Sequence, residues 1–268
     1  IEDWDFRDSL TRSQPIKIDA SGKSGAQFYE SWDKLYIMKS LTSDEVERMH
    51  AFLKHYHPYV VEKHGQTLLP QYLGMYRLTV ENVQYYFVVS RNVFGNLIIH
   101  KKFDLKGSTV DREANDKELE KVLPTLKDND FVNQKIKIEI GPEAKKKVMD
   151  MLEKDVQLLS QLHLMDYSLL VGIHDCVRAE EEALEENAAL QDDSESEDFE
   201  SGERWNYTPP ESPTNRDIPY RDVADLYQIR SIENRREIYF LAMIDVLTQY
   251  GVRKQAAKAA KTVKYGSN

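Results

Sequence analysis

Residues 72–94 read YLGMYRLTVENVQYYFVVSRNVF, and they contain two runs typical of β-strands, separated at Glu81 and Asn82 by a pair that favours a tight turn. A further strand-like run, LIIHKKFDL (97–105), follows. On the N-terminal side, residues 25–39 predict two short strands with a turn at 31–33, and TSDE (42–45) is a capping box that predicts a helix start. Paired strands around one helix indicate an antiparallel sheet, and hence an α+β fold class.

The second half of the chain also mixes helix and strand. Apolar residues recur along one side of 142–164 and predict a helix, and YSLLVGIHD (167–175) predicts a strand directly after it. REIYFLAMIDVLTQY (236–250) is a mainly apolar element near the C-terminal end. Pro58 lies inside the first predicted helix, and we expect it to kink or divide that helix.

Composition narrows the class of protein. The chain has 268 residues, enough for one large domain or two lobes with a substantial core. Its single cysteine, Cys176, excludes a disulfide framework and indicates a reducing compartment. No apolar run is long enough to span a bilayer, and residues 1–15 lack the pattern of a signal peptide, so we expect a soluble intracellular protein.

The net charge comes from one segment. Residues 179–203 hold twelve acidic residues and no basic one, and without those twelve negative charges the chain's −10 becomes +2. Such a segment buries too little apolar surface to offset the entropy lost on ordering, and three prolines follow it. We therefore predict that 179–217 is a disordered insertion.

Three charged side chains stand where packing alone does not explain them. Lys39 ends the predicted strand KLYIMK; it either extends to water or, after the stretch from Gly22 to Gly25, contacts a nucleotide phosphate. Asp245 interrupts the apolar run IYFLAMIDVL, where a carboxylate needs a cation, either a metal such as Mg²⁺ or a structural arginine. Asp166, between predicted helix and strand, fits a catalytic base or a turn-forming aspartate equally well.

A fourth candidate place is FDLKGSTVDRE (103–113). It brings Lys106, a glycine backbone, two hydroxyl groups and Arg112 together within seven residues. These groups predict either a cradle for an anion or the cap of a helix.

Longer motifs carry a specific resemblance. They are DLKGSTVDREA (104–114), PTLKDNDF (124–131), MDYSLLVGIHD (165–175), the element around Ile244 and Asp245, and AAKAAKTVK (256–264). Through them the chain, from DFRDSLTRS (5–13) onward, resembles the phosphatidylinositol phosphate kinases. The sequence has no HRD loop with a downstream asparagine and no DFG, which argues against a protein kinase.

The resemblance implies a two-lobed α+β kinase fold with antiparallel sheets and flanking helices. Residues 1–94 would form an ATP-binding lobe, and 95–268 a catalytic and lipid-binding lobe in which 246–268 begins the activation segment. Lys39 would bind nucleotide phosphates, Asp166 would be the catalytic aspartate and Asp245 the metal ligand. Further implied positions are Gly22, Gly25, Asn92, Val93, Phe94, Leu170 and Ile244 for the nucleotide, and Lys106, Arg112 and Lys127 for the inositol phosphate. The implied cofactors are ATP, with GTP left open, and Mg²⁺.

The C-terminal stretch RKQAAKAAKTVKYGSN (253–268) contains five basic residues and no acid. The interpretation that needs no function is a solvated helix end. The resemblance implies instead an activation segment that docks on an anionic membrane through residues such as Lys258 and Lys261. Ala257 matches the type II branch, which phosphorylates phosphatidylinositol 5-phosphate at the 4-hydroxyl. Two alternatives stay open: a type I kinase that phosphorylates phosphatidylinositol 4-phosphate at the 5-hydroxyl, and a low-activity phosphoinositide-binding scaffold or nucleotide sensor.

The partners expected from the resemblance are an anionic membrane surface and phosphatidylinositol 5-phosphate, and no nucleic acid. Type II members dimerise through a helix and strand that precede the first residue of this chain, so we expect that interface to be missing here. The expected location is the cytoplasm, peripherally on membranes, with the nucleus left open.

Overall fold

The computed structural model describes residues 3–18, 25–192, 227–232 and 235–250. The predictions made for Gly22, Ala257, Lys258 and Lys261 lie outside the described residues, as does the activation segment from residue 251 onward. None of the described helices combines the length and apolar character that crossing a bilayer requires.

The first lobe is built on a five-stranded antiparallel sheet with strand order β1-β2-β3-β5-β4. The hairpin predicted at the start joins β4 to β5, and both of its turn residues, Glu81 and Asn82, have positive φ angles (50° and 64°), as a two-residue hairpin turn requires. The elements of this lobe are α1 (Asp3–Thr11), β1 (Ile16–Ile18), β2 (Phe28–Glu30), β3 (Tyr36–Leu41), α2 (Ser43–Glu62), β4 (Tyr72–Val80) and β5 (Val83–Arg91).

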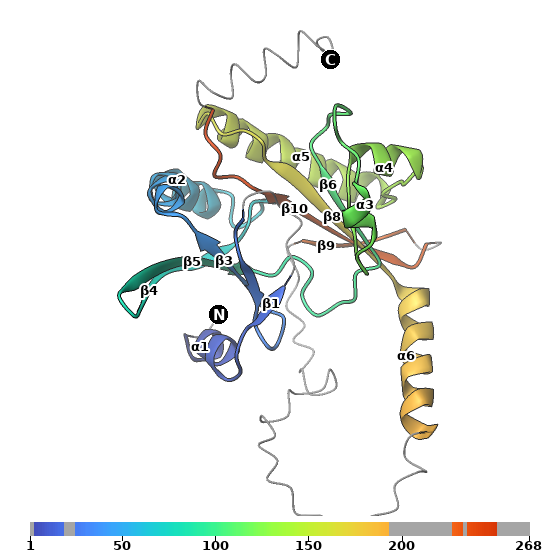
Figure 1. The fold of residues 1–268 in the computed structure, drawn as a ribbon. Helices are drawn as coiled ribbons and strands as arrows, with labels where there is room; N and C mark the ends of the chain where they lie inside the picture. The colour runs from blue at the N-terminus through green and yellow to red at the C-terminus, as the bar shows by residue number, and fades with distance from the viewer. Residues whose placement is uncertain (1–2, 19–24, 193–226, 233–234, 251–268) are drawn as a thin grey trace, which may run out of the picture.

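The second lobe is built on another five-stranded sheet, in the order β7-β6-β8-β10-β9 (Figure 1). All its pairings are antiparallel except that of β6 with β7. Its elements are β6 (Lys101–Leu105), α3 (Asp116–Leu119), β7 (Thr125–Leu126), α4 (Asp128–Asn133), α5 (Gly141–Gln161), β8 (Ser168–Asp175), α6 (Cys176–Asp192), β9 (Gln228–Arg230) and β10 (Glu237–Ile244). The predicted α+β class is confirmed.

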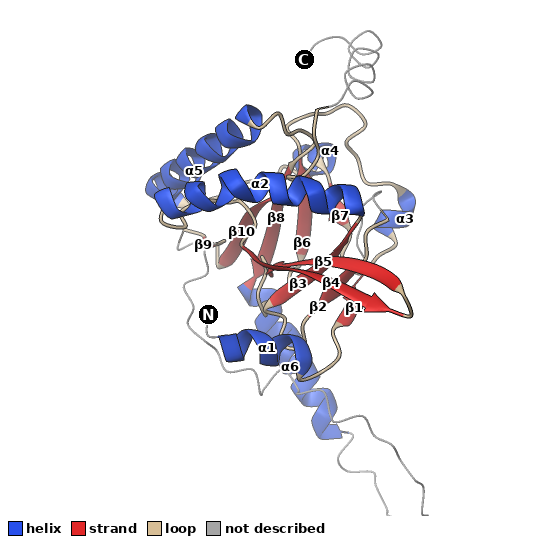
Figure 2. Cartoon of the chain, turned by 90° about the vertical axis from the view of Figure 1, so that its left-hand side faces the viewer, coloured by secondary structure: helices blue, strands red, loops and turns tan. Residues whose placement is uncertain are grey.

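Helix α2 begins at the predicted capping box. The Thr42 hydroxyl accepts from the Glu45 N–H at 3.3 Å, and the Glu45 carboxylate accepts from the Thr42 N–H at 2.8 Å. Pro58 does not divide the helix, which continues to Glu62. A proline removes one hydrogen bond, and here the buried face of the helix, which includes Phe52, packs into the core on the N-terminal side of it. Figure 2 shows α2 and α5 together on one side of the two sheets.

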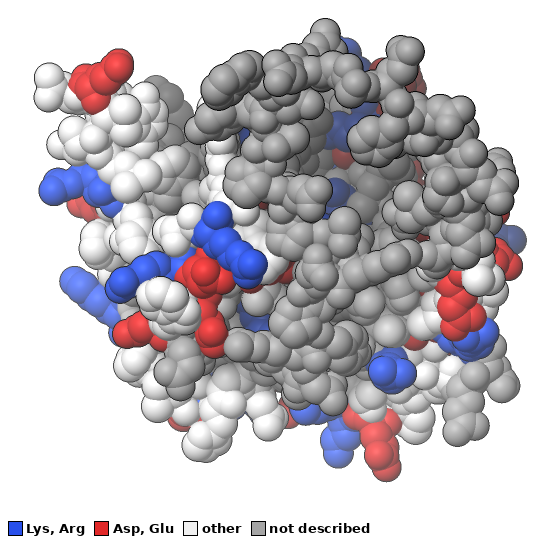
Figure 3. Space-filling model, turned by 90° about the horizontal axis from the view of Figure 1, so that it is seen from below, with Lys and Arg blue, Asp and Glu red and all other residues white. Residues whose placement is uncertain are grey.

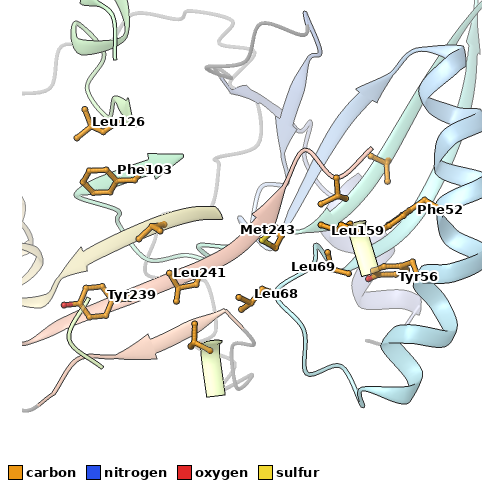
Figure 4. Packing of buried hydrophobic residues seen from close by; sticks show 14 of the residues in the cluster. Phe52, Tyr56, Leu68, Leu69, Phe103, Leu126, Leu159, Tyr239, Leu241 and Met243 are labelled. Atoms are coloured by element: carbon orange, nitrogen blue, oxygen red, sulfur yellow. The ribbon is translucent and has the colours of Figure 1, made fainter. Parts of the chain in front are cut away.

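One hydrophobic core joins the two lobes. Phe52 of α2, Leu159 of α5 and Met243 of β10 all belong to the same buried cluster. Leu68 and Leu69, from the connection between α2 and β4, belong to the same cluster and lie near Met243 (Figure 4). Because apolar burial is the main favourable contribution to folding, this shared core holds the two sheets in a fixed relation.

Residues 179–192, the part of the predicted disordered insertion that the structure describes, are helical. Helix α6 covers residues 176–192 and extends away from the second sheet (Figure 1), whereas 193–217 lie outside the described residues. Alanine, leucine and glutamate are strong helix formers, and this preference overrides the low hydrophobicity of the segment. The N-terminal part of α6 is also held to the second lobe. Glu182 accepts from Arg178 Nε at 2.7 Å, and its carboxylate lies 3.4 Å from His100 Nε2.

Candidate active site

Lys39 and Asp245 meet between the two lobes. Lys39 lies on β3, the middle strand of the first sheet, and Asp245 directly follows β10 of the second. Their Nζ and Oδ1 atoms are 3.7 Å apart, and the ammonium group also lies 5.7 Å from the centre of the Phe28 ring. Two residues 206 positions apart in the sequence, each singled out by its charge, thus form one ion pair.

Asp245 is more exposed than its apolar sequence neighbours suggest, with 54% of its side chain accessible. The strand before it is buried, but Asp245 has a φ of 59°, in the left-handed region. The chain therefore turns out of the strand at this residue and carries the carboxylate to the surface between the lobes. The carboxylate therefore does not sit in an apolar environment, and among the described residues the cation beside it is Lys39.

Asp166 lies beside Asp245 at the same end of two paired strands. Ser168 on β8 pairs with Ile244 on β10, and the Met165 N–H donates to the Thr248 carbonyl at 2.8 Å. Asp166 also has a left-handed backbone, with a φ of 62°. Such conformations are uncommon outside glycine, and here they turn the chain at the adjacent ends of β8 and β10, where both carboxylates lie.

The connection between the lobes is braced by Asn92. Its buried side-chain amide donates to the Lys34 carbonyl at 2.8 Å and to Glu30 Oε1 at 3.0 Å, while its oxygen accepts from the Phe94 N–H at 3.1 Å. These bonds use the Asn92 side chain to hold the connection to the β2–β3 turn. The Asn92 N–H also donates to the Leu35 carbonyl at 2.8 Å, so neither this N–H nor the side chain is available to a base.

Phe94 packs onto the second sheet. Its ring lies edge-on to Phe240 with centroids 5.9 Å apart, and a Cβ at Gly172 would lie 2.5 Å from Phe94 Cε1. Gly172 on β8 therefore makes room for the ring. Leu170 and Ile244 belong to the same face, because residues two apart on a strand share a face and paired residues face the same way.

Val93 and Gly25 are the other two predicted nucleotide positions that the structure describes. Val93 is half-buried in the connection between Asn92 and Phe94. Gly25 precedes β2 with a φ of 68°, a conformation that favours glycine.

The predicted anion cradle exists, and it holds a carboxylate of the protein itself. Asp128 Oδ1 accepts from the backbone N–H groups of Lys106 at 3.0 Å, Gly107 at 2.8 Å and Ser108 at 3.4 Å. Its Oδ2 accepts from Arg112 Nε at 2.7 Å, and Arg112 Nη2 also donates to Asp104 Oδ1 at 3.1 Å. The guanidinium group is thus clamped between two carboxylates.

Lys106 and Lys127 occupy equivalent ends of neighbouring strands. Lys106 follows β6 and Lys127 follows β7, and the two strands run parallel, so both lysines emerge at the same edge. Asp130 closes the unit by accepting from the backbone N–H groups of Lys127 and Ala114, each at 2.9 Å. The three predicted phosphate-binding residues therefore belong to one cross-linked loop pair, 104–114 with 127–130.

Sequence reasoning did not identify Asp128, Asp130 or Asp155. Asp128 and Asp130 had a local signal, because acids in the first turn of a helix favour capping. Asp155 had a signal as well: it continues the apolar spacing of the helix at a position between Leu152 and Leu159, where a charge is out of place.

Comparison with known proteins places the chain in a family. The sequence model described as phosphatidylinositol-4-phosphate 5-kinase matches residues 9–268. Phosphatidylinositol 5-phosphate 4-kinase type-2 alpha is 52% identical in Homo sapiens and 51% identical in Gallus gallus, each over 278 residues that cover 100% of this chain and 68% of the relative. The type-2 beta protein of Rattus norvegicus is 49% identical over 280 residues, 100% of this chain and 67% of the relative. The chain belongs to the phosphatidylinositol-4-phosphate 5-kinase family.

Proposed function

We propose that this protein is a lipid kinase that transfers the γ-phosphate of ATP to the 4-hydroxyl of phosphatidylinositol 5-phosphate, giving phosphatidylinositol 4,5-bisphosphate. The observation that supports the proposal is the 3.7 Å ion pair of Lys39 and Asp245. Asp166 lies next to this pair, in the segment just before β8. The names of the type-2 relatives supply the substrate and the position of transfer.

Each of the three residues has a part that its position supports. Phosphoryl transfer depends mainly on positioning and on charge stabilisation. Lys39 binds the nucleotide phosphates from the first lobe, and Asp245 would hold Mg²⁺ from the second. The half-exposed carboxylate of Asp245 fits a metal that uses one or two protein carboxylates and takes other ligands from phosphate and water. When bound, Mg²⁺ supplies neutralisation of the phosphate charge.

Asp166 acts as the general base. Its exposed position at the end of β8 lets a lipid hydroxyl approach it, and the neighbouring Asp245 keeps the reacting phosphate on the same side. Asp166 accepts the proton of the 4-hydroxyl as that oxygen attacks the γ-phosphorus atom and the bond to ADP breaks.

The nucleotide base lies between the connection at Val93 and Phe94 and the sheet face that carries Leu170 and Ile244. Since the Asn92 side chain is committed to the protein, the base is recognised through backbone groups. Backbone recognition of this kind also accommodates GTP.

The lipid head group binds at the loop pair 104–114 and 127–130. Lys106 and Lys127 hold its 5-phosphate, and Arg112, whose Nε and Nη2 are bonded to Asp128 and Asp104, positions the loop that carries Lys106. Ala257 with the neighbouring Lys258 and Lys261 selects the lipid. On the face seen in Figure 3, basic and acidic side chains of the described residues are interspersed. We attribute membrane attachment to the lysines after residue 250, each contributing about 1 kcal/mol near an anionic leaflet. The protein then works peripherally on cytoplasmic membranes, with the nucleus as a second location.

The experiment offers Mg-ATP with vesicles of phosphatidylinositol 5-phosphate and, separately, phosphatidylinositol 4-phosphate. We expect turnover of the 5-phosphate lipid and its loss in Asp245→Asn. Asp150→Asn is the matched control, because Asp150 forms an exposed pair with Lys154 on α5, and it should retain activity. Preference for the 4-phosphate lipid would favour the type I alternative, and vesicle binding without turnover would favour the scaffold.

A further inference from the structure

A buried carboxylate lies between the lobes and has no part in the transfer described above. Asp155, on α5, is 0% exposed. Its Oδ1 accepts from the Tyr59 hydroxyl and the Thr67 hydroxyl, each at 2.6 Å, and its Oδ2 accepts from the Leu68 N–H at 2.7 Å. Burial raises the pKa of this carboxyl, and the three donors oppose the rise. A buried carboxylate needs such partners, because an unpaired one is costly.

The three donors all belong to the first lobe, whereas Asp155 belongs to the second. Tyr59 lies near the end of α2. Thr67 and Leu68 lie in residues 67–71, which we call the interlobe strap; it is the second part of the segment that connects α2 to β4. The carboxylate therefore links the two lobes at a place distinct from their covalent connection at 92–100.

The interlobe strap is also bonded to β10, the strand that directly precedes Asp245. The Met243 N–H donates to the Leu68 carbonyl at 2.7 Å, and Met243 precedes Asp245 by two residues. The Tyr227 hydroxyl donates to the Leu69 carbonyl at 2.9 Å. Figure 4 shows Leu68, Leu69 and Met243 in one packed group. Leu68 is thus held from one side by α5 and from the other by β10.

The other end of the linkage reaches Lys39. Helix α2 starts directly after β3, the strand of Lys39, with Thr42 alone between them. A shift of α2 and the interlobe strap relative to α5 and β10 therefore moves Lys39 relative to Asp245. We propose that Asp155 is a positioning residue that fixes the first lobe against the second and so sets the separation of Lys39 and Asp245. This inference rests on the proposed function for its effect on catalysis.

The perturbation is Asp155→Asn, which keeps the size of the side chain and leaves one acceptor oxygen for three donors. We expect kcat to fall between about tenfold and about a hundredfold, the range for a displacement of up to about 1 Å in an active site. Tyr59→Phe removes one donor only and should give a smaller fall in kcat. It also keeps the test available if Asp155→Asn does not fold.

Two controls distinguish a positioning role of Asp155 from an effect on stability alone. Val148→Ala lowers stability by making a cavity on the same helix, away from the interlobe strap, and should keep kcat within about twofold at a temperature where it is folded. Combining Asp155→Asn with Lys39→Met should lower kcat no further than Lys39→Met alone, because Asp155 acts on kcat through the position of Lys39.

Hydrogen–deuterium exchange tests the linkage between the lobes independently of catalytic activity. In Asp155→Asn, peptides covering residues 67–71 and 239–247 should lose protection, whereas the β4–β5 hairpin should not. Unchanged protection, a fall in kcat equal to that of Val148→Ala, or effects that multiply with those of Lys39→Met would each overturn the proposal. If the wild-type protein phosphorylated no lipid, the proposed function would fail, and the exchange result would still decide the linkage.

Discussion

Gly172→Ala should disturb the junction between the lobes. The added Cβ would lie 2.5 Å from Phe94 Cε1 and 2.9 Å from Cδ1, whereas carbon atoms in contact prefer about 3.5–4.0 Å. The ring must therefore move by about 1 Å. It is braced by Phe240, and Ile99 Cδ1 lies 3.5 Å from the new Cβ, so little free space surrounds it.

Overpacking of this size costs about 1–3 kcal/mol of unfolding free energy. For a chain of this length each kcal/mol lowers Tm by roughly 2–4 °C. Because Phe94 belongs to the connection that we assign to the nucleotide base, the KM for ATP should rise as well, with a smaller effect on the KM for lipid.

The assay is a double-mutant cycle with Phe94→Leu, read by thermal unfolding and by ATP kinetics. A leucine at position 94 gives the new Cβ more room, so the double variant should be more stable than the sum of the single effects by about 1 kcal/mol or more. Additive effects, or a Gly172→Ala protein with unchanged Tm and unchanged KM for ATP, would refute the packing argument.

Three further predictions concern single side chains. Lys39→Met should reduce kcat at least about a hundredfold while Tm changes by no more than a few degrees, because the partly exposed, 3.7 Å pair with Asp245 contributes little to stability; kinetics and calorimetry check this together. Asp128→Asn should raise the KM for lipid about tenfold and leave the KM for ATP nearly unchanged, since it loosens the loops of the head-group site; vesicle titrations would show otherwise if both constants rose equally. Burial lowers the pKa of His100 below 6.5, although Glu182 opposes this shift. As the pH falls below 6.5 the unfolded chain therefore takes up the proton before the folded chain does, and the free energy of unfolding decreases. His100→Asn should show a smaller decrease in the free energy of unfolding, measured by urea titrations between pH 7 and 5, and an identical decrease would contradict the assignment.

Local sequence patterns predicted much of the fold. The hairpin at Glu81 and Asn82, the capping box of Thr42 and the helix before Asp166 each depend on residues close in the sequence, and all are found. Helix α6 departs from the predicted disorder because the helix preference of alanine and glutamate outweighs low hydrophobicity, and because the contact of Glu182 with His100 joins distant parts of the chain.

The candidate site was predictable in its residue types but not in its contacts. Charge in an apolar context marked Lys39 and Asp245, yet nothing local indicates that their side chains are 3.7 Å apart. The exposure of Asp245 depends on one left-handed backbone angle, which sequence patterns specify weakly outside glycine. Asp128 and Asp155 act through long-range hydrogen bonds, and single-sequence patterns carry no information on such partners.

The most direct test of the proposed activity is the position of the phosphate that the protein adds. Phosphatidylinositol 5-phosphate vesicles are incubated with Mg-ATP labelled at the γ-phosphate, and the labelled head group is released and its isomer identified by chromatography against standards. The proposal predicts label at the 4-position, and none when Asp166 is changed to asparagine. Label at the 3-position, or equal labelling by the Asp166→Asn protein, would contradict it.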